Sequence, residues 1–239
     1  MNSKPKGFLA SIFPSLFLTK KCFSQCGEEL VITSLLRQVG KQGMGFYVDI
    51  GAFHPYVGSN TFYFYRLGWK GINIDARPGS MNLFNLKRPR DINIQTGIGS
   101  TEGTLKYYML EEHPGMNTFS LETLRSCGME HKVTSTLEVP VTTMGKIQRQ
   151  HISSETQIDF VTIDTEGHEI EVLKGFDFDL HRPKVFAIEQ NDVLSIQDIV
   201  TNPVNQFMED KGYVAVGKNV ISLNVATVFY LDRKLTRGV

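Results

Sequence analysis

Short apolar runs alternate with amphipathic segments along most of this chain. Five of the runs predict buried strands, because each is short, rich in β-branched or aromatic side chains, and bounded by turn residues. They cover residues 45–50, 71–76, 92–99, 158–164 and 184–190. Helical periodicity predicts helices over residues 27–39, 60–68 and 80–88. Strands that alternate with helices form mainly parallel sheets, so the pattern predicts an α/β fold.

The last part of the chain has a different pattern. Residues 212–231 contain two alternating apolar runs separated by turn residues, which predicts an antiparallel hairpin. Strand–helix steps that end in a hairpin resemble the layout of class I methyltransferases. That Rossmann-like fold has a mainly parallel seven-stranded sheet, a C-terminal antiparallel hairpin and helices on both faces. Dinucleotide-binding folds normally continue in parallel at this point, so the hairpin favours the methyltransferase layout.

The N-terminal segment, residues 1–21, differs from the rest of the chain. Residues 7–18 are apolar and are flanked by lysines, but they are fewer than the roughly 20 residues that a transmembrane helix needs. We expect this segment to pack on the following domain, or on a neighbouring domain of a longer parent chain, such as a glycosyltransferase. Docking on a membrane surface is the alternative. Residues 22–239 are expected to form a single domain.

The composition indicates which classes of partner to expect and which cellular compartment fits the chain. Lys and Arg together number 25, as do Asp and Glu, so the formal net charge is zero. Nucleic-acid-binding domains usually carry a basic face, so no nucleic-acid partner is expected. The basic stretch LKRPR, residues 86–90, is expected to end a solvated helix. The cysteines Cys22, Cys26 and Cys127 do not form a disulfide framework, which fits a cytoplasmic location.

Acidic residues close four of the predicted strands: Asp49, Asp75, Asp164 and Glu189. One such residue would be unremarkable, because Asp is a common helix cap. Ligands of open α/β sheets bind outside the carboxyl ends of the strands, so the set of four predicts a site there. An acid after the second strand can accept both hydroxyl groups of a ribose.

The turn after the first strand, VDIGAFHP, bears on the cofactor. Gly51 allows a tight turn and Ala52 leaves room for a ligand, while Phe53 and Pro55 stand where a G-x-G-x-x-G run would place further glycines. That run brings backbone N–H groups against a pyrophosphate, which S-adenosylmethionine lacks. The turn therefore favours S-adenosylmethionine, and a nicotinamide-dependent oxidoreductase is the weaker alternative.

Several segments, in the same order, resemble the FkbM-type family of S-adenosylmethionine-dependent methyltransferases. They are SQCGEEL, FYVDIGAFHPYVGSNTFYFYRLGWKGINIDARPGSM, RPRDINI, MNTFS and IDTEGHEIEVLKG, of which the last is the most specific. The resemblance runs from about residue 22 to residue 190 and implies methylation of a hydroxyl oxygen, often on a sugar or a polyketide. This chain has DARP where the family commonly has Glu-Pro, and AFHP where it commonly has Ala-Asn-x-Gly.

The resemblance and the strand ends together give the predicted cofactor residues. In the scheme that the resemblance implies, Asp49, Gly51 and Asp75 hold the cofactor, and Gln25 reaches its amino acid end. Small and apolar residues around Ile98 offer an edge for an adenine. The full predicted set is Gln25, Asp49, Gly51, Ala52, Ser59, Asn60, Asp75, Ala76, Arg77, Ile98 and Asp164.

The IDTEGHEIEVLKG segment carries the first candidates for catalysis. A sugar hydroxyl is un-ionised at neutral pH, so its methylation is faster with a general base. Asp164 and Glu166 are the first candidates for that base. We expect Glu166 in the first turn of the helix that follows the strand, on the same stripe as Ile170 and Leu173.

Glu189 is the next candidate for the base, ahead of His54 and His168. A divalent cation held by several of these carboxylates is another way to lower the pKa of the acceptor. Residues 109–143 are expected to cover the pocket.

The predicted function is S-adenosylmethionine-dependent O-methyl transfer to a small or glycan acceptor, with a deoxyhexose favoured by the resemblance. The alternatives are a non-catalytic domain that binds a glycan or a partner, and an RNA-modifying methyltransferase. The neutral charge balance disfavours RNA, and the retained acids disfavour a domain that has lost its activity.

Overall fold

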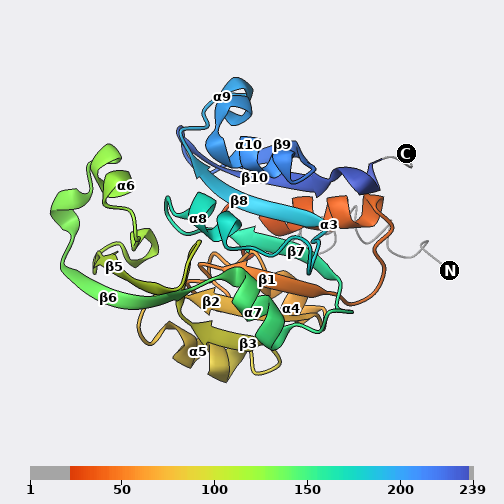
Figure 1. Ribbon diagram of the computed structural model, residues 1–239, viewed down its shortest axis with the longest axis horizontal. Helices are drawn as coiled ribbons and strands as arrows, with labels where there is room; N and C mark the ends of the chain where they lie inside the picture. Colours follow the sequence, from red (N-terminus) through yellow and green to blue (C-terminus); the bar gives the residue numbers. More distant parts are fainter. Residues whose placement is uncertain (1–21, 237–239) are drawn as a thin grey trace, which may run out of the picture.

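A seven-stranded sheet forms the centre of the computed structural model, which describes residues 22–236 (Figure 1). The predicted N-terminal segment, residues 1–21, lies outside the described residues. The strand order is β3-β2-β1-β7-β8-β10-β9. The strands are β1 (Phe46–Ile50), β2 (Lys70–Asp75), β3 (Ile92–Gln95), β7 (Ile158–Ile163), β8 (Val185–Asn191), β9 (Tyr213–Val220) and β10 (Val225–Asp232).

Only β10 runs against its neighbours in this sheet, pairing antiparallel with both β8 and β9. The other strand pairs are parallel. The predicted class I methyltransferase layout, with its C-terminal hairpin, is therefore confirmed. From the β1–β7 pair the chain builds the sheet outward in both directions, so the connections after these two strands leave the sheet on opposite sides.

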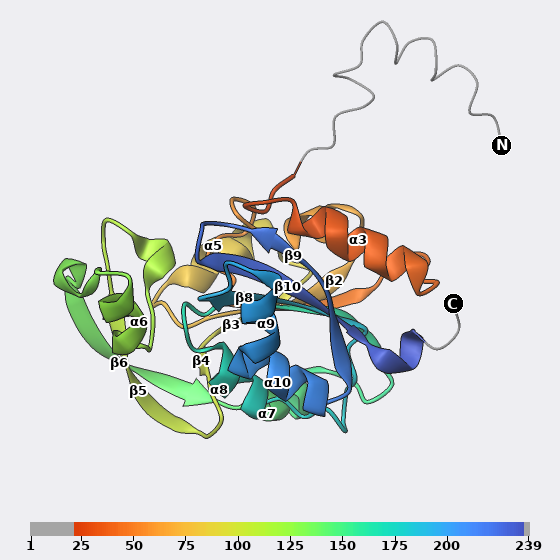
Figure 2. The same ribbon diagram turned by 90° about the horizontal axis from the view of Figure 1, so that it is seen from above.

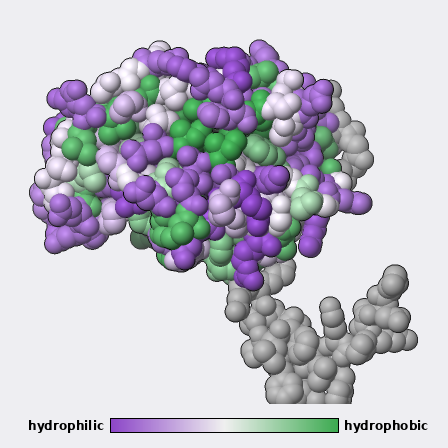
Figure 3. All heavy atoms as spheres, turned by 90° about the horizontal axis from the view of Figure 1, so that it is seen from below, coloured by the Kyte–Doolittle hydropathy of each residue, from purple (hydrophilic) through white to green (hydrophobic). Residues whose placement is uncertain are grey.

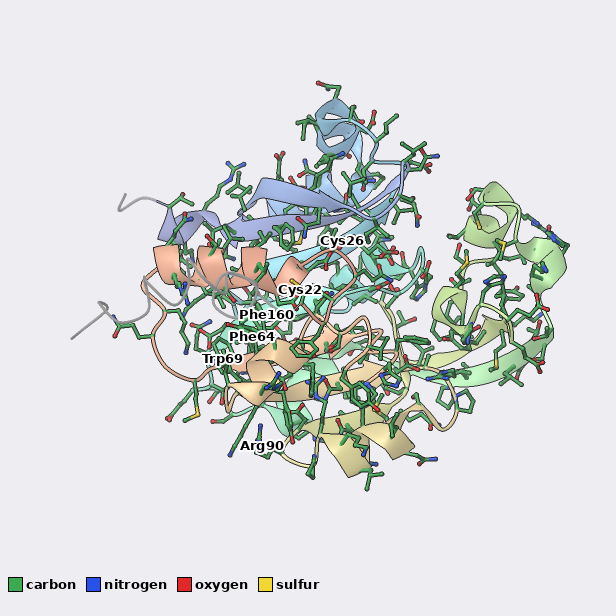
Figure 4. All side chains as sticks on the ribbon, turned by 180° about the vertical axis from the view of Figure 1, so that it is seen from behind. Cys22, Cys26, Phe64, Trp69, Arg90 and Phe160 are labelled. Atoms are coloured by element: carbon green, nitrogen blue, oxygen red, sulfur yellow. The ribbon has the colours of Figure 1, made fainter. Side chains whose placement is uncertain are left out.

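Helices cover both faces of the sheet, as predicted. On one face, α3 (Glu28–Gln38) and α4 (Phe62–Arg66) pack against side chains of β1, β7, β8 and β10. The rings of Phe64, Trp69 and Phe160 meet there, with Phe64 4.6 Å from Phe160 and 5.0 Å from Trp69 (Figure 4). On the other face lie α7 (Met144–His151), α8 (Glu169–Lys174) and α10 (Pro203–Asp210), and the remaining helices are α5 (Ser80–Lys87), α6 (Leu121–Ser126) and α9 (Ile196–Thr201).

The central strands are apolar on both faces because they are covered on both. In β7, Phe160 belongs to the aromatic cluster, while Val161 and Ile163 belong to the larger apolar core on the opposite face. All six residues of β7 are buried. This explains why apolar side chains occur on both faces of the strand.

The third predicted strand, residues 92–99, is divided between two sheets, which corrects the expectation of one continuous strand. β3 ends at Gln95, and the Thr96 N–H donates to the Asp75 carbonyl oxygen at 3.0 Å. β4 (Gly97–Ile98) then pairs with β6 (Ser135–Thr142), which also pairs with β5 (Gly103–Met109). A Cβ at Gly97 would lie 2.6 Å from the Phe119 ring, so the new sheet requires a glycine there.

The small sheet and α6 extend to one side of the main sheet (Figures 1 and 2). Three short 3-10 helices complete the described structure, at Pro114–Met116, Glu130–Lys132 and Arg233–Leu235. None of the helices within residues 22–236 has both the length and the apolar character that crossing a bilayer requires. On the face seen in Figure 3, apolar side chains gather near the middle and are surrounded by polar ones.

The LKRPR stretch is only partly solvated, which corrects a second expectation. Lys87, Pro89 and Arg90 are outside the buried set, but the Arg88 side chain is fully buried. Its Nε donates to Asp91 Oδ2 at 2.9 Å and its Nη2 donates to the Tyr47 hydroxyl at 2.7 Å. A buried arginine needs such partners, and one of them, Tyr47, is distant in the sequence.

Candidate active site

A cavity of about 720 Å³ opens at the carboxyl ends of β1, β2 and β7. It lies where the strand order reverses, which is where open α/β sheets bind their ligands. Met116, Asn117 and Phe119 contribute to its wall, so part of residues 109–143 does cover the pocket. All the predicted cofactor residues line this cavity: Gln25, Asp49, Gly51, Ala52, Ser59, Asn60, Asp75, Ala76, Arg77, Ile98 and Asp164.

The turn after β1 is held tightly against the end of β7. Gly51 has a φ of 85°, and a Cβ there would lie 1.7 Å from the Asp164 carbonyl oxygen. Only glycine permits both the conformation and this approach. Asp49 is buried beside the turn, where it accepts a hydrogen bond from the Thr61 hydroxyl at 2.6 Å. Burial raises the pKa of Asp49 to about 6.

Backbone N–H groups fix the orientation of Asp75 at the end of β2. Asp75 Oδ2 accepts from the Phe53 N–H at 3.1 Å, and Oδ1 accepts from the Arg77 N–H at 2.8 Å. Burial raises the pKa of this carboxyl above its usual value, while the hydrogen bond from Arg77 opposes the shift. The Arg77 guanidinium lies over the Phe53 ring, 5.3 Å from its centroid, and donates to the Phe53 carbonyl oxygen at 3.1 Å.

Two of the predicted cofactor residues also support the surrounding structure. The Ser59 hydroxyl accepts hydrogen bonds from the Thr61 and Phe62 N–H groups, at 3.3 Å and 3.2 Å. Asn60 Nδ2 donates to the Thr162 hydroxyl at 2.8 Å and so links the loop before α4 to β7. Their contribution to the cavity wall is therefore at least partly structural.

Three carboxylates meet near the ends of β7 and β8, where Asp164 and Glu166 line the cavity and Glu189 lies beside them. One oxygen from each of Asp164, Glu166 and Glu189 lies within 4.8 Å of the other two. Burial and the Glu189 charge hold the pKa of Asp164 well above its usual range. Burial and the Asp164 charge raise the pKa of Glu166 to about 8, and burial and the Glu166 charge raise that of Glu189 to about 8. The sequence predicts Asp164 and Glu189 at strand ends and Glu166 in the following helix, and the structure brings the three together.

Glu166 does not lie in the first turn of a helix, contrary to the expectation. Helix α8 begins at Glu169, and Glu166 and Gly167 have φ values of 54° and 94°, which an α-helix does not allow. The buried Glu169 carboxylate holds the loop, because its Oε1 accepts from the Thr165 and Gly167 N–H groups, both at 3.0 Å. The Thr118 hydroxyl donates to the Glu166 carbonyl oxygen at 2.7 Å.

The two candidate histidines are not among the residues that line the cavity. His54 Nδ1 accepts from the Tyr56 and Val57 N–H groups, at 3.3 Å and 3.0 Å, so this side chain orders its own loop. His168 packs against Phe119, with the ring centroids 5.2 Å apart. Its Nε2 is buried and has no hydrogen-bond partner among the described residues.

Sequence reasoning missed two contributors to the site. The sequence predicts Glu28 in an amphipathic helix, yet the residue is 1% exposed and lines a small cavity together with Asp164 and Glu189. Tyr107 of β5 lines the main cavity, and nothing in the pattern of β5 distinguishes it. An acid in the first turn of a helix is ordinary by helix-dipole criteria, so the only available signal for Glu28 was the SQCGEEL motif itself.

Comparison with known proteins agrees with this description. Residues 49–215, more than half of the chain, match the Methyltransferase FkbM domain. The matched range begins at Asp49 and includes Asp75, Asp164, Glu166 and Glu189. No curated protein gives a significant match.

Several solved structures of methyltransferases align with this chain over most of its length. A TehB-like SAM-dependent methyltransferase from Corynebacterium glutamicum has a TM-score of 0.44 and 11% identity, over 97% of this chain and 100% of that one. A putative RNA methyltransferase from Pyrococcus horikoshii has a TM-score of 0.43 and 10% identity, over 86% and 83%. An O-methyltransferase from Bacillus cereus, in complex with SAH, has a TM-score of 0.38 and 11% identity, over 97% and 92%.

Proposed function

Because the chain belongs to the FkbM methyltransferase domain family, we propose that it transfers a methyl group from S-adenosylmethionine to a hydroxyl oxygen of a small or glycan acceptor. A sugar such as a deoxyhexose is the favoured acceptor. The observation that carries the proposal is the position of Asp164. This residue lines the predicted cofactor cavity and also belongs to a group of carboxylates that can accept a hydroxyl proton.

The residues of the cavity fit S-adenosylmethionine in charge and in size. The methionine end of this cofactor carries an ammonium, a carboxylate and a sulfonium group and is positively charged overall, and the carboxyl groups of Asp49, Asp164 and Glu166 line the cavity. Each Asp75 oxygen accepts one backbone N–H and keeps a further lone pair for a ribose hydroxyl. The cavity of about 720 Å³ has the size of a small-molecule site, and the Ile98 side chain offers an apolar wall for an adenine.

The chain itself has to position the acceptor and remove its proton. When bound, the cofactor supplies an activated methyl group. A base works best when its pKa is close to the working pH, and burial gives Glu166 a pKa of about 8. We assign proton removal to Glu166 and Asp164, and we assign orientation of the acceptor to Glu189. The loop fixed by Glu169 keeps Glu166 at the cavity, which limits the entropy lost when the acceptor is aligned.

The proposal is tested with methyl-labelled S-adenosylmethionine and a panel of sugars, glycans, nucleosides and lipids. We expect labelled product with a hydroxyl-bearing sugar. Asp164→Asn and Glu166→Gln should each lower kcat about 10²–10⁴-fold, because a general base contributes that much. Affinity for S-adenosylhomocysteine, measured by calorimetry, should change less.

Glu171→Gln is the matched control for these variants. Glu171 lies on α8 but has its own partners, since it accepts from the Ser100 hydroxyl and the Lys174 ammonium, both at 2.6 Å. This variant should keep the wild-type kcat. Full activity in both Asp164→Asn and Glu166→Gln would contradict the catalytic assignment, and the absence of labelled product from every hydroxyl acceptor would contradict the proposed reaction.

A further inference from the structure

The three grouped carboxylates at the ends of β7 and β8 have no positively charged partner among residues 22–236. None of Asp164, Glu166 and Glu189 takes part in any of the described ion pairs. They come from three separate places: the end of β7, the loop before α8, and β8. Grouped and buried like charges are costly unless a cation or protons neutralise them.

Glu28 supplies a second and independent observation. This residue is in the first turn of α3, and its side chain is 1% exposed. Its Oε2 accepts from the Cys26 N–H at 2.9 Å, but its Oε1 is buried and has no hydrogen-bond partner among the described residues. Glu28 thus contributes a buried carboxylate oxygen that no described residue hydrogen-bonds.

A small cavity joins Glu28 to the other acids. It has a volume of about 10 Å³ and is lined by Glu28, Asp164 and Glu189, with Asn60 and Thr227 also in its wall. Such a volume is close to the space that one water molecule occupies, so it suits a single ion and not an organic group. Asp164 also lines the large cavity, so this small cavity directly adjoins the predicted cofactor site.

We propose that Asp164, Glu166 and Glu189, together with Glu28, bind one hard divalent cation at the border between the two cavities. All the ligand atoms are carboxylate oxygens, which Mg²⁺, Mn²⁺ and Ca²⁺ prefer. Oxygens on opposite sides of Ca²⁺ are about 5 Å apart and those around Mg²⁺ about 4 Å apart, and the observed oxygens lie within 4.8 Å of one another.

The role of the cation rests on the proposed function, but its binding does not. Beside an acceptor, a divalent cation polarises a hydroxyl group and lowers its pKa. The chain's own contribution is to hold the ligands: Asp164 and Glu189 are positioned by neighbouring strands, and Glu28 approaches from α3. The same acids then serve as cation ligands as well as neighbours of the acceptor proton.

The test measures binding of Mn²⁺ to the full chain after treatment with EDTA and removal of the chelator. We expect one Mn²⁺ per chain by electron paramagnetic resonance, displaced by excess Mg²⁺ or Ca²⁺. Glu189→Gln and Glu28→Gln should each weaken binding at least about tenfold, since even the loss of an outer-shell partner has effects of that size. Glu171→Gln should bind Mn²⁺ like the wild type.

A saturating amount of S-adenosylhomocysteine separates the cation from the ammonium group of the cofactor. Mn²⁺ should remain bound in its presence, because Glu28 and Glu189 line the small cavity and are not among the residues that line the cofactor cavity. Displacement of Mn²⁺ by this ligand, or no Mn²⁺ binding by the wild-type chain at millimolar concentration, would overturn the inference. If Mn²⁺ does not bind but labelled methyl product still forms in EDTA, the inference fails while the proposed function stands.

Discussion

Asp49 shows how the surroundings of one side chain determine its charge. Its position at the end of β1 follows from the sequence, but its partners do not. Thr61 donates to Asp49 Oδ2 at 2.6 Å and in turn accepts from Arg88 Nη1 at 3.0 Å. Burial still dominates and raises the pKa of Asp49 from 3.8 to about 6. The carboxylate is therefore ionised at neutral pH and becomes neutral in mild acid.

We expect affinity for S-adenosylmethionine to fall as the pH is lowered through about 6. Protonation of Asp49 removes a negative charge that lines the cavity, and the methionine end of the cofactor is positively charged. Since the group is ionised above this pKa, full affinity belongs to the higher pH. Calorimetry between pH 5 and 8 would measure the effect, which is at most about tenfold per pH unit.

The variant Asp49→Asn separates the contribution of this residue to the pH dependence from that of the other acids of the cavity. The variant should bind the cofactor more weakly at neutral pH and should lose the part of the pH dependence that centres near 6. Parallel pH curves for the variant and the wild type would contradict the role of Asp49.

At the scale of elements, a buried pair fastens the end of α5 to the sheet. Arg88 and Asp91 are both buried, with a 2.9 Å distance from Nε to Oδ2. Asp91 also accepts from the Gly71 N–H and from Asn73 Nδ2, both at 3.0 Å and both on β2. The pair therefore links the turn after α5 to the strand that carries Asp75.

Arg88→Met should lower the free energy of unfolding by about 3–5 kcal/mol, because it leaves Asp91 buried without its cation. Urea unfolding followed by circular dichroism would measure this loss. Arg125→Ala is the control, because the Arg125–Glu130 pair is exposed and contributes little. Equal stability of the two variants would show that the buried pair does not fasten the element.

At the scale of the whole molecule, two sheets and the segment before α3 line one cavity. Asp75 comes from the main sheet, Tyr107 from the small sheet and Gln25 from the segment before α3. Asn117 is held in the covering segment, because its Oδ1 accepts from the Leu110 N–H at 2.7 Å. A ligand in the cavity should therefore stabilise parts of the chain that are distant in the sequence.

Hydrogen–deuterium exchange tests this coupling. Saturation with S-adenosylhomocysteine should slow amide exchange in residues 116–119, because the ligand holds the covering segment closed. Exchange in α10, which is not among the residues that line the cavity, should not change. Unchanged exchange at 116–119 in a saturated sample would contradict a covering role for this segment.

The sequence by itself determined the order of strands and helices, the C-terminal hairpin and the acids at four strand ends. These are local properties: buried strands need apolar runs, and residues at strand ends are recognised from the runs that precede them. The same reasoning placed Asp49, Asp75, Asp164 and Glu189 in the region of the site. The cofactor role of these residues remains a prediction.

Only the tertiary structure decided what depends on contacts between distant segments. It divided residues 92–99 between two sheets, moved Glu166 from a helix into a left-handed loop, buried Arg88, and brought Glu28 to a small cavity that acids at the ends of β7 and β8 also line. Each outcome was set by a partner remote in sequence, such as Thr118 for Glu166 and Tyr47 for Arg88. A local pattern can therefore predict that an acid lies at a strand end, but the charges and donors that surround it depend on the fold.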